Sequence, residues 1–360
     1  MVFSFTRVPD GSIAAFVEFA RAGRDLGFER LWIPDQTYHV DPFVLLAHVA
    51  AEVPGLELGL AVTNPYTRHP VQIARAAASV AEISGGRFLL GLGAGNRKHV
   101  IERLGLDGSR AAERVREAAI LIRRLLRGET VTHTGHWTLQ AIRLEREGAV
   151  EVPILIGTRN PRMLRIAGQV GDGVLMESLV SPGAQAYGFE EVRAGAAAVG
   201  RTPQRFEVVA WQSVTITDDR SAGVDAMRPW VAYLLGMTTP AVAARMGVDT
   251  DVTRRVHEAF AAGGAQAAMP FVGVDEVDRF LIVGSPAEVA SRSAALILGG
   301  ATDFAVQVWS AVAGGGDPKH GRGAHDQLVR FAREVRPLVE QTLKAQTKSV
   351  HADATGRRGE

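Results

Sequence analysis

Two polar residues, Asp35 and Gln36, follow an apolar run of strand length at Arg30–Pro34. A carboxylate beside an amide at the end of a buried strand is suited to binding a ligand or handling a proton. The alternative is that Asp35 caps a following helical turn through its side chain. The residues alone leave both roles open.

A second candidate region contains Ala61, Val62, Thr63 and Asn64 and ends at Pro70. Its two prolines, together with amide and hydroxyl groups, favour a fixed backbone over a mobile loop. Such a backbone is suited to holding a flat ring in place. An ordinary proline-shaped turn is the alternative.

Glycines dominate a third candidate loop, Gly93-Ala94-Gly95-Asn96, which Arg97 and Lys98 follow. Closely spaced glycines let backbone N–H groups approach an anion, and the two basic side chains add positive charge. The order of the glycines differs from the G-x-G-x-x-G fingerprint of dinucleotide-binding proteins. The loop therefore does not by itself indicate a dinucleotide site.

The fourth loop, Gly157-Thr158-Arg159-Asn160, precedes Pro161, a residue type favoured in the first turn of a helix. A helix N-terminus binds phosphate well, and an arginine adds a charged fork. An uncharged helix cap would have a similar sequence. Together the four loops predict a mostly cationic rim that suits an anionic cofactor.

The elements that must position these loops follow from the alternation of apolar runs with helical periodicity. Eight runs have strand length: Val2–Thr6, Arg30–Pro34, Glu57–Thr63, Arg87–Gly93, Pro153–Gly157, Gly173–Met176, Phe206–Ile216 and Asp303–Val308. Eight strands with intervening helices predict an α/β fold, a (β/α)8 TIM barrel, over an open doubly wound sheet. In such a barrel the loops after the strands meet at one mouth, where active sites lie.

Two segments interrupt the alternation. Residues from about 129 to 144 carry apolar side chains at alternate positions and predict a β-hairpin insertion, whereas about 221–279 predicts a helical insertion. We expect a single barrel domain over residues 1–344. Residues 345–360 lose apolar periodicity and are expected to form a disordered tail.

Composition excludes several classes of protein. The 40 Lys and Arg nearly balance the 39 Asp and Glu, so a basic field for nucleic acid is absent. The chain has no Cys, which excludes disulfides and thiolate chemistry. The ten His are scattered without metal-binding spacing. With no leader-like start and no apolar run near the ~18 residues of a membrane span, we expect a cytoplasmic protein without membrane contact.

Six motifs resemble those of the bacterial luciferase-like superfamily: GFERLWIPD (27–35), VTNPYTRHP (62–70), SGGR (84–87), GLGAG (91–95), PILIG (153–157) and DG (172–173). Within that superfamily the chain is most similar to methylenetetrahydromethanopterin reductases and their relatives that use the deazaflavin coenzyme F-420. The resemblance covers most of the chain, from Val2 to about residue 309.

This resemblance implies a TIM barrel that holds the deazaflavin at its mouth, and a non-proline cis peptide at Ala61–Val62 behind the ring. It also implies roles for four groups of residues: Asp35 and Gln36 near the ring, Thr63 and Asn64 at its face or edge, Gly93–Asn96 beside the cofactor, and Gly157–Asn160 at its phosphate. A homodimer or a higher homo-oligomer is also implied.

Two positions depart from the family pattern. Gln36 stands where the family often has His, and Thr6 stands where methanopterin reductases have an acidic residue. Neither an amide nor an alcohol is a good proton donor near neutral pH. Glu177, after the sixth strand, is a candidate substitute. The departures put the pterin substrate in doubt more than the cofactor.

We therefore expect an F-420-dependent oxidoreductase that transfers a hydride to or from a C=N or C=O centre of a small organic substrate, in the manner of methylenetetrahydromethanopterin or methylenetetrahydrofolate reductases. Asp35, Gln36 and Glu177 are the catalytic candidates. An FMN-dependent luciferase-like monooxygenase is the alternative. A cofactor-binding protein without catalysis is a third hypothesis, motivated by Thr6 and Gln36.

Overall fold

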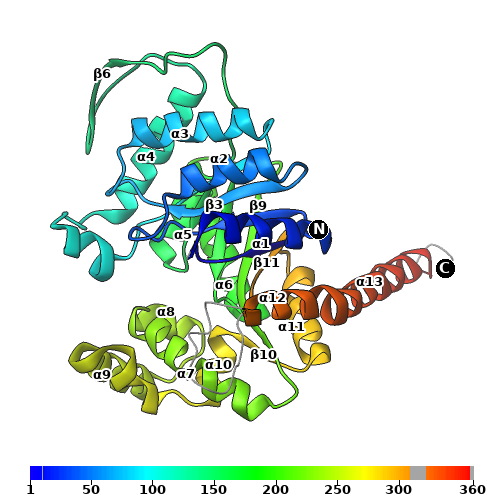
Figure 1. Ribbon diagram of the computed structural model, residues 1–360. Coiled ribbons are helices and arrows are strands. Elements are labelled where there is room, and N and C mark those ends of the chain that lie inside the picture. Colours follow the sequence, from blue (N-terminus) through cyan, green and yellow to red (C-terminus); the bar gives the residue numbers. More distant parts are fainter. Residues whose placement is uncertain (10, 309–321, 357–360) are drawn as a thin grey trace. The chain divides into compact units, whose positions relative to one another are not determined.

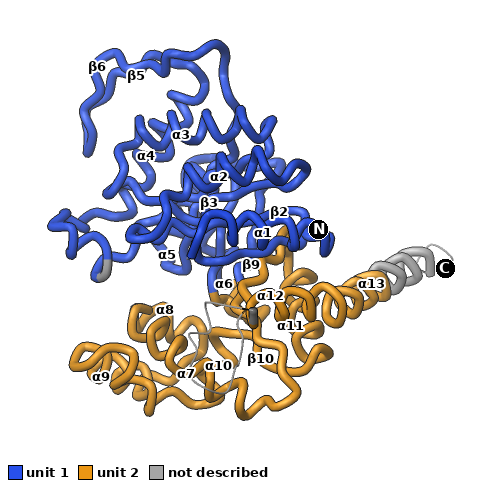
Figure 2. Tube along the Cα trace, viewed as in Figure 1, with its two compact units in different colours: residues 1–177, 187–211 blue, residues 178–186, 212–360 orange. Residues whose placement is uncertain are grey.

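The computed structural model describes residues 1–9, 11–308 and 322–356 (Figure 1). It comprises two compact units (Figure 2). Unit 1 contains Met1–Glu177 and Tyr187–Trp211, and unit 2 contains Ser178–Ala186 and Gln212–Glu360. The strand β9 (Glu207–Ile216) contributes residues to both units. The single domain of residues 1–344 remains a prediction.

Unit 1 alternates parallel strands with helices. Its strands, in pairing order, are β1 (Val2–Thr6), β2 (Arg30–Ile33), β3 (Glu57–Thr63), β4 (Phe88–Leu92), β7 (Ile154–Gly157) and β8 (Gly173–Glu177). The helices that connect them are α1 (Ile13–Asp25), α2 (Pro42–Glu52), α3 (Pro70–Ile83), α4 (Ala111–Leu126) and α5 (Pro161–Val170). Short helical turns η1 (Arg97–Ile101) and η2 (Glu102–Leu104) precede α4, and α6 (Pro182–Ala197) follows β8.

Local sequence explains where these helices begin. Ser12, Asp41 and Asn160 each accept a backbone N–H at the start of α1, α2 and α5, as good N-cap residues do. Proline occupies the first position of α2, α3 and α5, where its missing N–H costs no helical hydrogen bond.

The complete sheet has the order β10-β9-β11-β1-β2-β3-β4-β7-β8, and β9 also pairs with β8. The two additional strands are β10 (Ile282–Gly284) and β11 (Asp303–Val308). Eight strands therefore close into a ring, and β10 lies beside the end of β9. The (β/α)8 barrel and all eight of its predicted strands are confirmed.

Both predicted insertions have the expected secondary structure. A hairpin of β5 (Val131–Thr134) and β6 (Thr138–Ile142) lies in unit 1. In unit 2, the helical segment comprises α7 (Arg220–Gly236), α8 (Pro240–Arg245), α9 (Thr250–Ala268), η3 (Met269–Phe271) and α10 (Val274–Phe280), and α7 packs on α9. Unit 2 also contains α11 (Pro286–Leu298), α12 (Arg322–Arg330), η4 (Phe331–Val335) and α13 (Arg336–Gly356).

The carboxy-terminal segment differs from the expected irregular tail. Residues 345–356 continue α13 without a break. Residues 357–360 of the expected tail lie outside the described residues. In the part of the chain that the structure describes, no helix has the length and apolar character required to span a membrane.

A charged cluster lies inside the amino-terminal end of the unit 1 strands. The Arg30 side chain is only 4% exposed and donates to Glu57 at 2.6 Å and to Glu207. Its guanidinium also lies over the Trp32 ring, 5.3 Å from the centroid. Arg30 therefore closes the barrel interior at the end opposite the mouth.

Candidate active site

Asp35 and Thr63 form a hydrogen-bonded pair at the carboxyl ends of neighbouring strands. Thr63 Oγ1 donates to Asp35 Oδ2 at 2.7 Å, and Thr63 is fully buried. Asp35 does not cap the next helix, because Asp41 caps α2. Of its two open roles, the structure therefore excludes helix capping.

The protonation of Asp35 reflects its surroundings. Burial raises the pKa of the Asp35 carboxyl, and the Thr63 hydrogen bond lowers it in part. Desolvation disfavours a charged carboxylate, so the neutral acid is favoured relative to a carboxyl in water. Asp35 is thus a carboxyl whose proton is held more tightly than usual.

Ala61 and Val62 are joined by a non-proline cis peptide bond, as the family resemblance implied. Both residues are partly exposed, whereas the preceding Leu58, Gly59 and Leu60 are buried. The carboxyl end of β3 therefore presents the small apolar side chains of Ala61 and Val62 at the barrel mouth.

Three glycines make room for Val62: Gly91 on β4, Gly93 directly after β4, and Gly157 at the end of β7. A Cβ on Gly157 would lie 2.4 Å from a Val62 methyl carbon, and one on Gly93 would lie 2.5 Å from the other. A Cβ on Gly91 would lie 3.0 Å from Val62 Cγ1, the methyl carbon that a Cβ on Gly157 would also meet. The backbone at these glycines therefore approaches the methyl groups of the partly exposed Val62 closely. Val62 and the three glycines are defined here as the Val62 cradle.

Asn64 fixes the loop that follows β3. Its Oδ1 accepts from Tyr66 N at 3.1 Å, from Thr67 N at 3.0 Å and from Thr67 Oγ1 at 3.2 Å. Asn64 is 3% exposed. Its oxygen therefore serves its own loop, which is a turn-forming role of asparagine, and this places the loop beside Thr63.

The glycine loop after β4 continues from the Val62 cradle. Gly93 is buried, and Ala94 and Asn96 are partly exposed. Gly95 has φ +70°, a left-handed conformation that favours glycine, and its ideal Cβ position lies 3.1 Å from the Asn64 side chain. Residues 93–96 and Asn64 are thus neighbours at the mouth.

The loop after β7 is ordered by its own polar groups. Thr158 Oγ1 accepts from Asn160 N at 2.9 Å, and Asn160 Oδ1 accepts from Arg162 N at 3.1 Å. Asn160 is therefore the uncharged cap of α5 that the sequence left open as an alternative. Gly157, Thr158 and Arg159 stay partly exposed beside it.

Glu177 ends β8 next to this loop. Its Oε2 accepts from Arg159 Nη1 at 3.1 Å, and the Tyr187 hydroxyl donates to the Arg159 carbonyl at the same distance. Arg159 is thereby held at both its side chain and its backbone. Glu177 is joined to the phosphate-binding candidate loop, not to Asp35.

Two further predicted positions have different surroundings. Gln36 is exposed, and its backbone forms a turn from Pro34 to His39. Thr6 is 2% exposed, and its Oγ1 has no hydrogen-bond partner among the described residues.

The expected cationic rim is largely neutralised by ion pairs. Arg97 pairs with Glu102 at 2.8 Å, and Arg159 pairs with Glu177 at 3.1 Å. Lys98 is exposed. The rim thus combines both signs of charge, and its positive field is weaker than the basic residues alone indicated.

Tyr66 belongs to the VTNPYTRHP motif, but the sequence analysis assigned it no role and did not predict its contacts. The Tyr66 hydroxyl donates to the Ser109 carbonyl at 3.1 Å, and the Arg114 guanidinium lies 5.4 Å from the centre of its ring. These contacts fasten the loop after β3 to the segment before α4. Ser109 and Arg114 are far from Tyr66 in the sequence, so no motif spacing could predict these contacts.

The barrel carries polar loops around Asp35 and the Val62 cradle at the carboxyl ends of its strands, which is where enzymes with this fold have their active sites. The family model described as luciferase-like monooxygenase matches residues 1–303. The chain belongs to this family.

Three proteins similar to this chain are named as reductases or as F420-dependent enzymes. The chain is 32% identical to the 5,10-methylenetetrahydromethanopterin reductase of Archaeoglobus fulgidus, over 84% of this chain and 92% of the relative. It is 30% identical to the F420-dependent hydroxymycolic acid dehydrogenase of Mycobacterium tuberculosis, over 57% and 60% of the two chains. The coenzyme F420-dependent tetrahydromethanopterin reductase of Methanopyrus kandleri has a similar structure, with a TM-score of 0.77 and 25% identity over 93% of this chain and 98% of that chain.

Proposed function

We propose that the protein is a coenzyme F420-dependent oxidoreductase that transfers a hydride between the deazaflavin and a C=N or C=O centre of a small organic substrate. Two proteins that align with most of the chain are named a methylenetetrahydromethanopterin reductase and a coenzyme F420-dependent reductase, which supports this proposal. The observation that carries the proposal is the Val62 cradle beside the Asp35–Thr63 pair. It offers an apolar surface next to a carboxyl with a raised pKa.

The residues at the mouth fit the coenzyme. A Cβ on Gly93 or Gly157 would displace Val62, so the glycines preserve an apolar support for one face of a flat ring. Thr158, Arg159 and the first turn of α5 offer donors for a phosphate. When bound, the deazaflavin supplies the hydride chemistry, and the protein orients the reactants and excludes water.

Asp35 is the residue that we assign to proton handling. Its Oδ2 is fixed by Thr63, which leaves Oδ1 as the oxygen that holds a proton toward the substrate. Burial favours the neutral acid. With this assignment, Asp35 supplies the proton donor that Thr6 and Gln36 do not provide at the positions where the family has acidic and histidine side chains.

The sequence analysis suggested Glu177 as a proton donor in place of Thr6 and Gln36, but we assign it a different role. Its carboxylate accepts a charge-assisted hydrogen bond from Arg159. We infer that Glu177 orients Arg159 toward the cofactor phosphate. Gln36, exposed beside Asp35, is assigned to contact the substrate or the ring edge.

Cofactor titration tests the proposal and its alternative. The purified full-length chain is titrated separately with F420 and FMN while its tryptophan fluorescence is followed. Saturable F420 binding with little FMN binding is expected. The converse result would favour an FMN-dependent monooxygenase and overturn the proposal.

The substrate class and the assembly are finer parts of the proposal. A reduced pterin or folate that carries a C=N centre is the first substrate to test, because the methylenetetrahydromethanopterin reductase of A. fulgidus aligns with 84% of this chain.

We further propose a cytoplasmic homodimer or higher homo-oligomer, on the basis of the family resemblance. Light scattering coupled to size-exclusion chromatography measures the assembly.

A further inference from the structure

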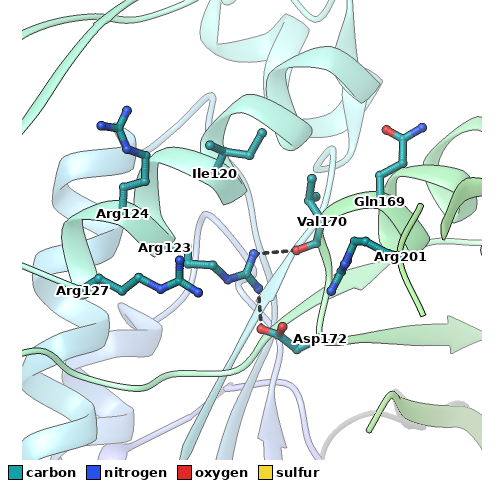
Figure 3. Close-up of a pocket in the computed structure, with 8 residues that line it drawn as sticks. All are labelled: Ile120, Arg123, Arg124, Arg127, Gln169, Val170, Asp172 and Arg201. Carbon is teal, nitrogen blue, oxygen red and sulfur yellow. Dashed lines mark hydrogen bonds and ion pairs between the residues drawn. The ribbon is translucent and has the colours of Figure 1, made fainter. Parts of the chain in front are cut away.

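A pocket lies in unit 1, at the end of the barrel strands opposite the candidate active site. It has a volume of about 310 Å³ and adjoins Asp172, the residue directly before β8 (Figure 3). Its lining residues are Ile120, Arg123, Arg124, Arg127, Gln169, Val170, Asp172 and Arg201. This volume is at the lower end of the range for small-ligand pockets, roughly 300–1,000 Å³.

Two of the four arginines are anchored to the carboxyl end of α5. Arg123 donates to the Val170 carbonyl at 2.6 Å and to Asp172, and Arg201 Nη1 donates to the Gly168 and Gly171 carbonyls at 3.0 and 3.1 Å. The helix contains no basic residue in its own last turn. These arginines therefore satisfy carbonyls at the negative end of the helix dipole.

Arg127 caps the carboxyl end of α4 through its backbone, whose N–H donates to the Arg123 carbonyl at 3.1 Å. Its exposed side chain takes no part in the cap and has no ion-pair or hydrogen-bond partner among the described residues. In Figure 3 the Arg127 side chain extends toward the Arg123 side chain, whose guanidinium faces Val170 and Asp172. Arg201 approaches from the other side, whereas Arg124 and Gln169 turn away.

The charge of the pocket is unbalanced. Arg124 is neutralised by Glu129 at 2.7 Å, and Arg123 is neutralised by Asp172. The positive charges of Arg127 and Arg201 have no carboxylate of their own in the pocket. Arg127 and the anchored Arg201 thus line the same pocket as the anchored Arg123 and leave it with an excess of positive charge, which an oxyanion would balance.

We propose that this pocket binds a phosphate group, carried by inorganic phosphate or by a small phosphorylated molecule. Arg127 and Arg201 bind the phosphate oxygens, and the anchored Arg123 supplies additional positive charge. The pocket and the candidate active site lie at opposite ends of the strands, so phosphate binds without displacing a cofactor. Phosphate bound at this end of the barrel is expected to stabilise the folded state.

Calorimetric titration of the full-length chain tests the site. Inorganic phosphate, AMP and adenosine are compared at constant ionic strength, set with chloride. Both phosphates are expected to bind, and adenosine is expected not to bind. Tighter binding of AMP would identify a phosphorylated molecule as the ligand, whereas equal binding would identify the phosphate group alone.

Two variants on one helix segment separate this site from general charge effects. Arg127→Gln removes the unpartnered guanidinium and should weaken phosphate binding about tenfold or more, as expected for a lost charge-assisted hydrogen bond. Arg116→Gln removes an exposed arginine of α4 that does not line the pocket and should leave binding unchanged. Circular dichroism confirms that both variants fold.

Three outcomes would overturn the proposal. The first is absence of phosphate binding by the unmodified chain. The second is an equal loss of binding in both variants, which would indicate a diffuse charge effect. The third is preferential binding of a glutamate oligopeptide, which would identify an acidic chain as the ligand. F420 affinity, measured in parallel, should be the same in Arg127→Gln as in the unmodified chain.

Discussion

Thr63 Oγ1 lies 2.7 Å from Asp35 Oδ2, although the two residues are separated by 28 positions in the chain. The pair joins the ends of β2 and β3, which are neighbours in the sheet. Burial and this hydrogen bond act in opposite directions on the pKa of Asp35, and burial has the larger effect. The proposed proton chemistry depends on that balance.

Replacing Asp35 by Asn should remove the exchangeable proton while keeping the size of the side chain. We expect kcat to fall by roughly 10²–10⁴-fold, the usual contribution of a general acid or base. F420 affinity should change much less, and a fluorescence titration measures it. Loss of cofactor binding with unchanged turnover per bound cofactor would assign Asp35 to binding instead.

The Thr63→Val variant should shift the pH dependence of catalysis in a defined direction. The Thr63 hydroxyl lowers the pKa of Asp35, so removing it raises that pKa further. If the protonated carboxyl is the active form, activity persists to higher pH before the alkaline decline. The kcat/KM profile measures this shift, and a decline at lower pH would refute the role of Asp35 as an acid.

The Val62 cradle predicts a coupled pair of substitutions. Gly157→Ala places a methyl group where a Val62 methyl carbon already lies, so F420 affinity should fall about tenfold or more. Adding Val62→Ala relieves the clash and should restore part of the affinity, which a double-mutant cycle measures.

Gly183→Ala is the matched control for this cycle, because its added Cβ meets no atom within 4 Å. It should bind F420 like the unmodified chain. Strictly additive losses in the Gly157→Ala and Val62→Ala double variant would contradict the proposed contact between these residues.

Asn64→Ala should destabilise the protein, because three donors lose the Oδ1 acceptor. The expected cost is about 1–3 kcal/mol in the free energy of unfolding, measured by urea denaturation. Asn64→Asp keeps the acceptor oxygen and should retain more of the stability. A larger loss in Asn64→Asp would show that the amide nitrogen matters more than the loop hydrogen bonds.

Arg30→Met should weaken the barrel without changing the mouth. The substitution leaves Glu57 and Glu207 without their shared cation. We expect a loss of about 2 kcal/mol in the free energy of unfolding, below the roughly 3–5 kcal/mol for fully buried pairs, because both carboxylates are partly exposed. The same denaturation experiment measures it, and unchanged stability would contradict the account of this cluster.

The sequence predicted the barrel well because its strands are buried on both faces and appear as continuous apolar runs. The runs Glu57–Thr63 and Asp303–Val308 match β3 and β11 in the structure. Strand β10 was not predicted, because its three residues carry too little periodicity. The helical course of residues 345–356 was missed for a related reason, since that segment has no apolar stripe.

Site residues could be predicted singly, but not as partners. Asp35 and Thr63 each stood out at a strand end, yet their hydrogen bond depends on strand adjacency. The pairing of Arg159 with Glu177 likewise brings two loops together in space, and it weakens the positive charge expected at the rim. Arg127 and Arg201 gave no signal, because only the fold places them in one pocket.

Single-turnover hydride transfer tests the central claim most directly. The purified chain is loaded with reduced F420 and mixed, without oxygen, with a methylene-tetrahydropterin, a methylenetetrahydrofolate or a simple carbonyl compound. Return of the visible absorbance of oxidised F420, in proportion to reduced substrate formed, is the predicted result. Absence of transfer to every C=N and C=O compound, together with oxygen-dependent turnover of reduced FMN, would contradict the account.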